Sequence, residues 1–461
     1  MSQKNETTLL VFSLLITLGL LGGILWFFDI IRFPQNQPGA ERKNQPGAER
    51  ISFGERILNT GEVTPDKKAG VQAISEKNYT QAIASLERSL KLKRNDPHAL
   101  IYLNNARIGA AKSYSVVASV PIGNNPNVSL EILRGIAQAQ KEVNTSGGIK
   151  GVPLKVGIAN DDNNPEIAQQ IAASLVKNPE VLGVVGPYSS DTTLAAGTIY
   201  DTGKLVAISP ISTSVKISNF SPYIFRTVPS DFIAARSLAN YMVKNLQKRQ
   251  AAVFFNSRSN YSQSLKSEFV SSVLLEGGRV LGEFDLSQGN FSAAKSLEQA
   301  TGEGAEVLML ATDTESLDKA LQVVQLNQKR LNVLGGDDVY SIKTLEVVGE
   351  AALGMVVAVP WHILGDRQSD FPQKSRDLWG ADVSWRTAMA YDATVALIAA
   401  LERNPTRSGI QQALTASDFS PTGASGAIRF LPSGDRSAPV QLVKVVTGNR
   451  SRTGYDFEPV R

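Results

Sequence analysis

Cysteine is absent from this chain, and histidine occurs only twice, at His98 and His362. The lack of cysteine excludes disulfide bridges, thiolate zinc sites, a cysteine nucleophile and a lipid-modified cysteine anchor. The two histidines lie far apart in the sequence, which argues against a histidine-built metal site. The formal net charge of +4 comes with both signs interspersed, so no basic block indicates nucleic acid. We therefore expect no metal, no cofactor and no nucleic-acid partner.

What is present is typical of a globular protein with more than one domain. Hydrophobic residues make up 42% of the chain and charged residues 20%, an ordinary balance for a protein with a buried core. At 461 residues the chain exceeds one typical domain, and two or three domains are the natural expectation.

The first apolar feature is the uncharged run LLVFSLLITLGLLGGILWFF, residues 9–28. It has the length of about 20 residues that a helix needs to cross a bilayer. A cleaved signal peptide would have a shorter apolar core and a small-x-small cleavage site, and the overlapping WFFDIIRF offers none. We interpret residues 1–31 as an uncleaved transmembrane anchor.

The charges beside this run bear on the orientation of the anchor. Lys4 stands on one side, and Arg32, Arg42 and Lys43 stand on the other. The positive-inside rule alone keeps the larger part of the chain in the cytoplasm, but the rule weakens when a long domain is translocated. From these residues alone the orientation stays open.

Two segments separate the anchor from the rest of the chain. Residues 32–65 are predicted to be a flexible linker, because NQPGAER occurs twice within 36–50 and its residues cannot build a core. Residues 66–111 show apolar positions at helical spacing, with Asp96-Pro97 as a helix start. This helical hairpin resembles one tetratricopeptide repeat followed by a helix. Because such repeats need about three copies to be stable alone, we expect a spacer packed on a neighbour.

After the hairpin, short β-branched runs alternate with helical stretches, which predicts an α/β fold with parallel sheets covered by helices. One helix is expected at 129–144, ended by Gly147-Gly148, and another begins at Asn164-Pro165. Extended segments at 223–231 and 354–363 interrupt the alternation, which predicts two lobes joined by several crossings. The strands are expected at 114–120, 154–160, 181–186, 205–209, 251–256, 279–286, 306–311 and 332–336.

The loops after these strands are rich in hydroxyl, amide and acid side chains, whereas the opposite ends, such as KNPE and EGGR, resemble ordinary turns. In open parallel sheets, ligands bind beyond the carboxyl ends of the strands, so this asymmetry predicts a cleft for a polar small molecule. The alternative for any single loop is that Ser, Asn and Asp cap helices. The six loops read PIGNNPNVS, NDDNNP, GPYSSDTT, SPISTS, NSRSNYS and GGDDVYS.

Two of these loops carry most of the predicted chemistry. In GPYSSDTT the segment 189–192 opens a helix whose free N–H groups, with the serine hydroxyls, suit a carboxylate. In GGDDVYS the adjacent Asp337 and Asp338 are compatible with a metal site, a proton-sharing pair, an ammonium site or a helix cap. No calcium-loop spacing surrounds them, and no nucleophile is placed beside His362, so we expect no enzyme.

Several blocks, in order, resemble one protein family. VVGPYSSDTTLAAG, LVAISPISTS, YIFRTVPSD and NYSQSLKSEF look like the type I periplasmic solute-binding proteins, above all the branched-chain amino acid (leucine/isoleucine/valine) binding proteins of ABC transporters. The resemblance covers about 114–447 and implies two α/β lobes, hinged by three crossings, that close on an amino acid. The implied binding domain is 112–461, with lobe 1 at 114–228 and 360–425 and lobe 2 at 232–356 and 426–447.

The resemblance implies which residues of lobe 1 bind a ligand carboxylate. Ser189 or Ser190 matches the serine that contacts it. Ile211, through its main chain, and Thr213, through its hydroxyl and N–H, lie beside it, with Ser212 between them.

In lobe 2, Tyr261 matches an aromatic side chain that lines the pocket, and Asp337 matches the acid that pairs with the ligand ammonium. Asp338 is then either a helix cap or an added negative charge at the pocket rim. The sequence also departs from the leucine binders: Asn127 and Val128 stand where they have an aromatic lid, and Asp313 stands where a second aromatic is expected. The pocket is therefore expected to favour a polar or cationic amino acid, or a small amide, over leucine.

The resemblance finally implies a function and a location. It predicts a membrane-anchored solute-binding protein that delivers an amino acid or related small polar solute to an ABC permease. A solute receptor belongs outside the cytoplasmic membrane, which places residues 33–461 in the periplasm on a single-pass anchor, against the local charge bias. The alternative is a ligand-sensing or adaptor protein that uses the same fold without transport.

Overall fold

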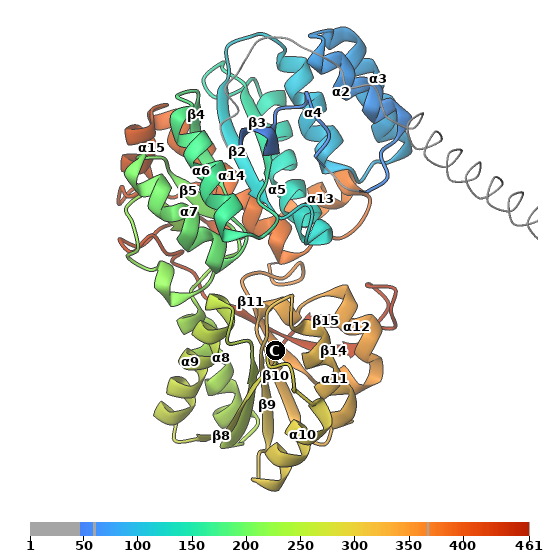
Figure 1. Cartoon of the computed structure of the whole chain (residues 1–461), viewed down its shortest axis with the longest axis vertical. Coiled ribbons are helices and arrows are strands. Elements are labelled where there is room, and N and C mark those ends of the chain that lie inside the picture. Colours follow the sequence, from blue (N-terminus) through green and yellow to red (C-terminus); the bar gives the residue numbers. More distant parts are fainter. Residues whose placement is uncertain (1–46, 59–60, 367, 461) are drawn as a thin grey trace, which may run out of the picture. The chain divides into compact units, whose positions relative to one another are not determined.

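The computed structural model describes residues 47–58, 61–366 and 368–460 of the chain (Figure 1). The anchor predicted at 1–31 lies outside the described residues, as does the first copy of the repeated unit, 36–42. Among the helices of the described part, none combines the length and the apolar character that a bilayer span requires.

Lobe 1 is built on a six-stranded sheet of order β1-β3-β2-β4-β5-β6, in which only β1 runs antiparallel to its neighbour. Helices cover the sheet and bury its Val, Ile and Ala side chains. The strands are β1 (Ile51–Ser52), β2 (Tyr114–Val120), β3 (Leu154–Asn160), β4 (Val181–Val185), β5 (Ala207–Ser209) and β6 (Ile224–Arg226). The helices are α5 (Pro126–Thr145), α6 (Pro165–Lys177), α7 (Ser190–Thr202), α13 (Phe371–Trp379), α14 (Trp385–Arg403) and α15 (Arg407–Leu414).

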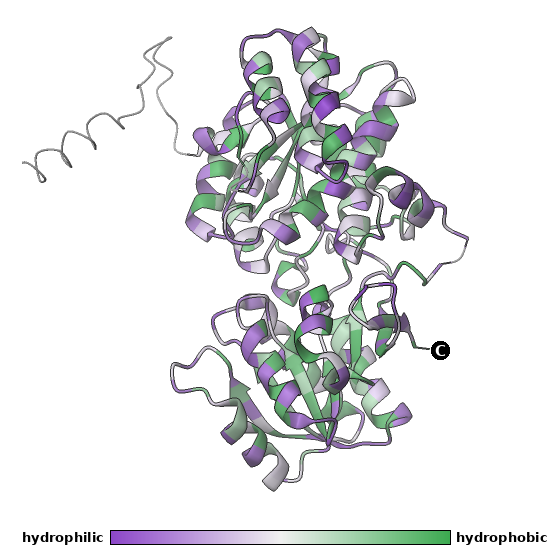
Figure 2. Cartoon of the chain, turned by 90° about the vertical axis from the view of Figure 1, so that its right-hand side faces the viewer, coloured by the Kyte–Doolittle hydropathy of each residue, from purple (hydrophilic) through white to green (hydrophobic). Residues whose placement is uncertain are grey.

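Lobe 2 has a seven-stranded sheet of order β15-β14-β11-β10-β9-β7-β8, parallel except at β14 and β15. Figure 2 shows its apolar strands enclosed by helices with polar outer faces. The strands are β7 (Gln250–Phe255), β8 (Arg279–Asp285), β9 (Val307–Ala311), β10 (Asn332–Gly335), β11 (Val356–Val359), β14 (Gln441–Thr447) and β15 (Tyr455–Pro459). The helices are α8 (Asp231–Asn240), α9 (Asn260–Leu275), α10 (Ala293–Gly302), α11 (Leu317–Asn327) and α12 (Ile342–Val348).

The chain passes between the lobes after β6, after β11 and before β14, as the resemblance implies. The boundary expected at residue 426 is wrong. Strand β13 (Gly426–Ala427) pairs with β12 (Thr422–Gly423), Phe430 packs against Phe225 of lobe 1, and Asp435 forms an ion pair with Arg226. Lobe 2 therefore resumes at β14, and β15 extends it beyond residue 447.

The second copy of the repeated unit and the residues that follow it correct the predicted linker. Within the segment expected at 32–65, β1 pairs with β3, Ser52 is fully buried, and Arg50 forms an ion pair with Asp162 at 2.6 Å. An extended chain with free N–H and C=O groups can add a strand to an exposed sheet edge, and β1 uses the edge of β3 in this way. The part of this segment at 47–58 is thus bound to lobe 1.

The predicted hairpin consists of three helices, α2 (Pro65–Ser75), α3 (Tyr79–Leu92) and α4 (Pro97–Ile108). Asp96 caps α4 as expected, because its carboxylate accepts the Ala99 N–H at 3.0 Å. Helix α4 is almost wholly buried, and Asn105 on it donates to the Val156 carbonyl of β3 at 2.7 Å. The helical segment is therefore packed on lobe 1.

Candidate functional site

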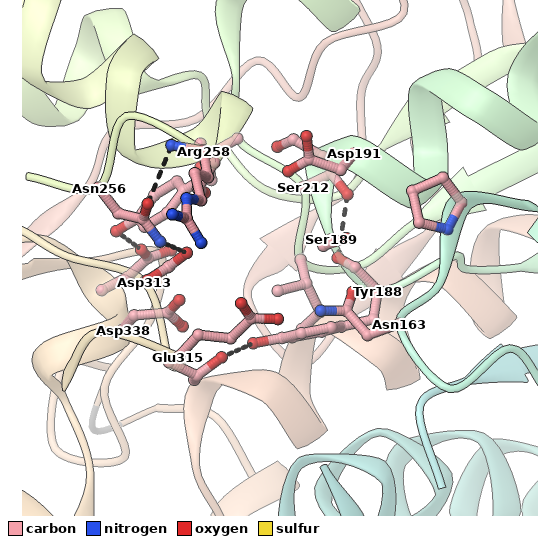
Figure 3. Close-up of a pocket in the computed structure, with 18 residues that line it drawn as sticks. Asn163, Tyr188, Ser189, Asp191, Ser212, Asn256, Arg258, Asp313, Glu315 and Asp338 are labelled. Atoms are coloured by element: carbon pink, nitrogen blue, oxygen red, sulfur yellow. Dashed lines mark hydrogen bonds between the residues drawn. The ribbon is translucent and has the colours of Figure 1, made fainter. Parts of the chain in front are cut away.

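A cavity of about 220 Å³ lies between the two lobes, beyond the carboxyl ends of their central strands (Figure 3). Both lobes contribute side chains to it, as expected for open parallel sheets. The predicted site residues that line the cavity are Ser189, Ser190, Ile211, Ser212, Thr213, Tyr261, Asp313, Asp337 and Asp338. The structure thus brings together residues that lie up to about 150 positions apart in the sequence.

The first part of the lobe 1 wall is the N-terminus of α7. The Ser189 hydroxyl accepts the Thr192 N–H at 3.2 Å, and the Thr192 hydroxyl accepts the Ser189 N–H at 3.1 Å, which together form a capping box. Ser190 follows at the first helical position, and its hydroxyl accepts the Ser214 N–H at 3.3 Å. The helix N-terminus faces the cavity and favours a negatively charged group there.

The loop after β5 supplies the second part of this wall. The Ser212 hydroxyl bonds with those of Thr193, at 2.8 Å, and Ser209, at 2.9 Å, and donates to the Tyr188 carbonyl at 3.0 Å. The buried Thr213 hydroxyl, in contrast, has no hydrogen-bond partner among the described residues. Ser212 therefore holds the wall together, while the Thr213 hydroxyl, which lies near the buried Asp231 carboxyl, makes none of these bonds.

Asp337 lies on the lobe 2 side, in a short 3-10 helix (Asp337–Val339) that follows β10. The Tyr261 hydroxyl donates to its carboxylate at 2.5 Å. Gly336 precedes it because a Cβ there would collide with the Tyr261 hydroxyl and Leu265. Burial and the neighbouring Asp338 carboxylate raise the pKa of Asp337 to about 8. A cation next to Asp337 would favour its ionised form.

Asp338, predicted to be a helix cap or an added negative charge at the pocket rim, lines the cavity as a carboxylate that is paired with Arg386. It is buried, and its carboxylate accepts from Arg386 Nη2 at 2.8 Å. Arg386 lies in the first turn of α14, in lobe 1, and also faces Glu131 at 3.7 Å. Burial lowers the pKa of Arg386, but the carboxylates of Glu131 and Asp338 outweigh burial and raise it.

The predicted rim residues are misplaced as well. Neither Asn127 nor Val128 lines the cavity: Asn127 is exposed in the first turn of α5, and Val128 is buried in the lobe 1 core. Their neighbour Asn125 is the residue that reaches lobe 2, where its side-chain amide donates to the Thr314 hydroxyl at 3.2 Å. The loop is at the cleft as predicted, but the residue facing the cleft is two or three positions earlier.

Sequence reasoning missed several lining residues, notably Tyr188, Arg258 and Glu315 (Figure 3). All three lie in loops that follow strands, so loop position was the available signal. Asp313, which was predicted, is held by Asn256 Nδ2 at 2.8 Å and by the Ser316 N–H at 3.0 Å. Burial and the carboxylates of Asp313 and Asp191 raise the pKa of Glu315, so the mouth of the cavity concentrates negative charge.

Together these groups form a two-sided polar cavity. Among the described residues, lobe 1 presents a helix N-terminus and a buried hydroxyl without a hydrogen-bond partner, and lobe 2 presents a buried carboxyl without a cationic partner. Such an arrangement can hold a solute with one anionic and one cationic end.

Comparison with known proteins gives the family. A family model described as "Periplasmic binding protein" matches residues 123–450. An amino acid binding protein of Pseudomonas aeruginosa is 30% identical over 150 residues, 32% of this chain and 40% of that protein. The leucine-specific-binding protein of Salmonella typhimurium is 26% identical over 229 residues, 49% of this chain and 61% of that protein. The match thus spans less than two thirds of each of these relatives.

Solved structures agree on the fold. A leucine binding protein from Thermotoga maritima superposes with a TM-score of 0.66 at 22% identity, over 75% of this chain and 97% of that one. An ABC transporter substrate-binding protein from Desulfitobacterium hafniense, solved with Leu, gives a TM-score of 0.65 at 21% identity, over 75% and 100%. At these identities the likeness concerns the fold alone. Because the family model covers most of the chain, this protein belongs to the periplasmic binding protein family, and it has the two-lobed fold of the solved structures.

Proposed function

We propose that this protein is a membrane-anchored extracytoplasmic solute-binding protein that captures an amino acid or a related small polar solute between its lobes. The observation that carries this proposal is the pairing of a buried Thr213 hydroxyl without a partner in the described residues with an Asp337 carboxyl that has no cation. A zwitterion satisfies both, since its carboxylate takes the hydroxyl and the α7 N-terminus and its ammonium takes Asp337. Each end then belongs to one lobe, so the solute stabilises the closed state.

The charge of the cavity supports a polar or cationic solute over leucine. Five carboxyl groups and one guanidinium group line it, and the guanidinium belongs to Arg258. A hydrocarbon side chain would bury Asp337 without a cationic partner, which is costly. An ammonium, guanidinium or amide group would give it one. The carboxyl groups are those of Asp191, Asp313, Glu315, Asp337 and Asp338.

The proposal includes a cellular setting for the protein. The apolar run at 9–28 serves as a single-pass anchor in the cytoplasmic membrane, with the binding domain in the periplasm. The tetratricopeptide-like helices, packed on lobe 1, act as a spacer between membrane and binding domain. A relative of this fold is named a substrate-binding protein of an ABC transporter, which supports an ABC permease as the partner that receives the solute.

A thermal-shift screen of the purified full chain against single amino acids, amides and urea tests the ligand. A solute present at a hundred times its dissociation constant stabilises the folded state by about 2.7 kcal/mol. We expect arginine, lysine or glutamine to raise the melting temperature more than leucine. Tight binding of leucine, with arginine, lysine, glutamine and urea ignored, would refute the polar ligand. No stabilisation by any of these solutes would refute amino acid capture itself.

A further inference from the structure

Arg386 forms a buried ionic contact from one lobe to the other. Its side chain is 4% exposed and that of Asp338 10%, and their atoms Nη2 and Oδ1 lie 2.8 Å apart. Arg386 belongs to α14 of lobe 1, and Asp338 follows β10 of lobe 2. The guanidinium also lies over the Trp385 ring, 4.4 Å from its centre, and its Nη1 donates to the Tyr340 carbonyl at 3.4 Å.

One other ion pair in the described residues also joins the lobes, and it differs in its surroundings. Arg450, in the turn between β14 and β15, meets Asp382 of lobe 1 at 2.5 Å. These side chains are 37% and 27% exposed, and neither lines the cavity. Exposed pairs contribute little to stability, whereas separating a buried pair leaves a charge without compensation. The two pairs therefore form a matched comparison.

The charges around Arg386 divide the roles of the two adjacent aspartates. Asp337 and Asp338 line this end of the cavity, and Arg386 contacts Asp338 and, within lobe 1, Glu131. It bonds to Asp338, while Asp337 receives only the Tyr261 hydroxyl. Asp337 therefore has no cationic partner among the described residues.

We propose that Arg386 is a positioning residue for solute capture. It neutralises Asp338 across the lobe boundary, so that Asp337 stays available for the cationic group of the solute. Because this contact joins the two lobes, it couples lobe closure to binding. The inference rests on the proposed function for the identity of the solute, but the closure contact is a property of the chain itself. When the lobes separate, water replaces the contact on both sides, so the pair forms only in the closed state.

Removing one member of the pair has a specific consequence. In Asp338→Asn the buried Arg386 guanidinium loses its lobe 2 partner and keeps Glu131 of lobe 1 at 3.7 Å. The adjacent residue Asp337 is the acid that remains beside position 338 in the sequence of lobe 2. The guanidinium then competes with the solute's cation for Asp337, and affinity falls. In the double variant D338N/R386M this competitor is gone, so affinity returns toward that of the wild type even though a contact has been lost.

The absence of cysteine makes closure measurable in the full chain. Cysteines introduced at the exposed Asn127 and Asn290, one in each lobe, take spin labels without background. Distances between the labels are measured by pulsed electron paramagnetic resonance, without addition and with a mixture of the common L-amino acids. We expect R386M to lose at least half of the short-distance population in both conditions, and R450M to keep it.

The outcomes separate the inference from the proposed function. A wild type that ignores the mixture, with R386M still depleted in the short-distance population, refutes amino acid capture and leaves the closure contact standing. Equal behaviour of R386M and R450M, with a wild type that responds, overturns the inference alone. A wild type with no short-distance population in either condition overturns both.

Isothermal titration completes the test with the amino acid of that mixture that binds most tightly. We expect D338N to bind at least tenfold more weakly than the wild type, and D338N/R386M to bind more tightly than D338N. A double variant as weak as the product of the two single effects would overturn the inference. The melting temperature of each ligand-free variant identifies any loss of affinity that is only loss of folding.

Discussion

The two halves of the cavity occupy equivalent positions in their lobes but differ in chemistry. In lobe 1 the loops after β4 and β5 present mainly neutral hydroxyls, most of which are already bonded to one another through Ser212 and Ser209, together with the single carboxyl of Asp191. In lobe 2 the loops after β9 and β10 present carboxyls. In the lobe 1 half the hydroxyls hydrogen-bond to one another, apart from that of Thr213. In the lobe 2 half the Asp337 carboxyl has no cationic partner among the described residues.

This difference shows where binding free energy comes from. A buried hydroxyl that is already hydrogen-bonded costs little, so the lobe 1 half is stable without a solute. A buried carboxyl without a cation is costly, and the protein reduces the cost by raising the pKa of Asp337. A cationic group removes this cost, so the lobe 2 half should dominate affinity and the lobe 1 half should set orientation.

The largest effect is expected at Asp337. Asp337→Asn keeps the shape and the partner of Tyr261 but removes the charge that a cation requires. We expect affinity for the amino acid that binds most tightly to fall by at least a hundredfold, or about 2.7 kcal/mol, in isothermal titration. Asp338→Asn should cost clearly less. Equal losses in the two variants would mean that the adjacent acids do not have separate roles.

A pair of substitutions in lobe 1 sharpens the comparison. Thr213→Val removes a hydroxyl without a partner in the described residues, so we expect about tenfold weaker binding, or about 1.4 kcal/mol, with an unchanged melting temperature. Ser212→Ala removes a hydroxyl with three partners, so we expect a loss of about 1–3 kcal/mol in stability and affinity close to wild type. The reverse assignment of the two effects would contradict this description of the wall.

The pH dependence of stability tests the charge on the lobe 2 half. The groups that face Asp337 are Asp338, Asp231, Tyr261 and Arg386. Because its pKa in the folded state is raised to about 8, the folded protein holds this proton more tightly than the unfolded chain. The stabilisation that this proton on Asp337 provides is complete below about pH 4 and is lost as the pH rises to about 8.

Asp337→Asn mimics the protonated form at every pH. The pH dependence of stability should therefore appear as a difference in melting temperature between this variant and the wild type. The melting temperature of the variant should match that of the ligand-free wild type near pH 4 and exceed it by a few degrees near pH 8.5. Thermal denaturation followed by circular dichroism measures the gap. A gap that does not change with pH would show that Asp337 is ionised in the empty cavity.

How much of this could be read from the sequence depends on the range of the interactions. The strands, the helix start at Asn164-Pro165 and the position of Asp337 after β10 follow local patterns of apolar residues and caps. The partner of Asp338 could not be read, because Arg386 is 48 positions away and in the other lobe. The same limit explains Ser212, whose role is set by two hydroxyls and one main-chain carbonyl from three segments.

Two further corrections have a different origin. The composition of residues 47–58 is that of a linker, yet β1 pairs there because the edge of β3 offers it free backbone groups. Asn127 and Val128 were misplaced because the first turn of α5 begins at Pro126, three residues before the start predicted at 129. A shift of that size turns different side chains toward the cleft. The position of the loop could therefore be predicted from the sequence, but the residue of the loop that faces the cleft could not.

The smallest expected effect concerns how this added strand supports lobe 1. Arg50 holds Asp162 at 2.6 Å, and Asp162 and Asn163 both have left-handed backbone conformations, with φ near 50° and 53°. Asn163 lines the cavity. Because the pair is partly exposed, Arg50→Met should cost less than about 1 kcal/mol in stability and less than about threefold in affinity. Thermal denaturation in low and high salt measures it, since salt screens such a pair.

The matched control is Arg88→Met, which breaks the ion pair with Asp66 between α3 and α2, away from the cavity. Both variants should lose a similar, salt-sensitive part of their stability, and only Arg50→Met should change affinity at all. An effect of Arg50→Met on affinity as large as that of Thr213→Val would mean that the strand beside β3 belongs to the binding site of lobe 1. The hydroxyl wall of lobe 1 would then depend on a strand that precedes the binding domain in the sequence, and the two halves of the cavity would differ in mechanical support as well as in charge.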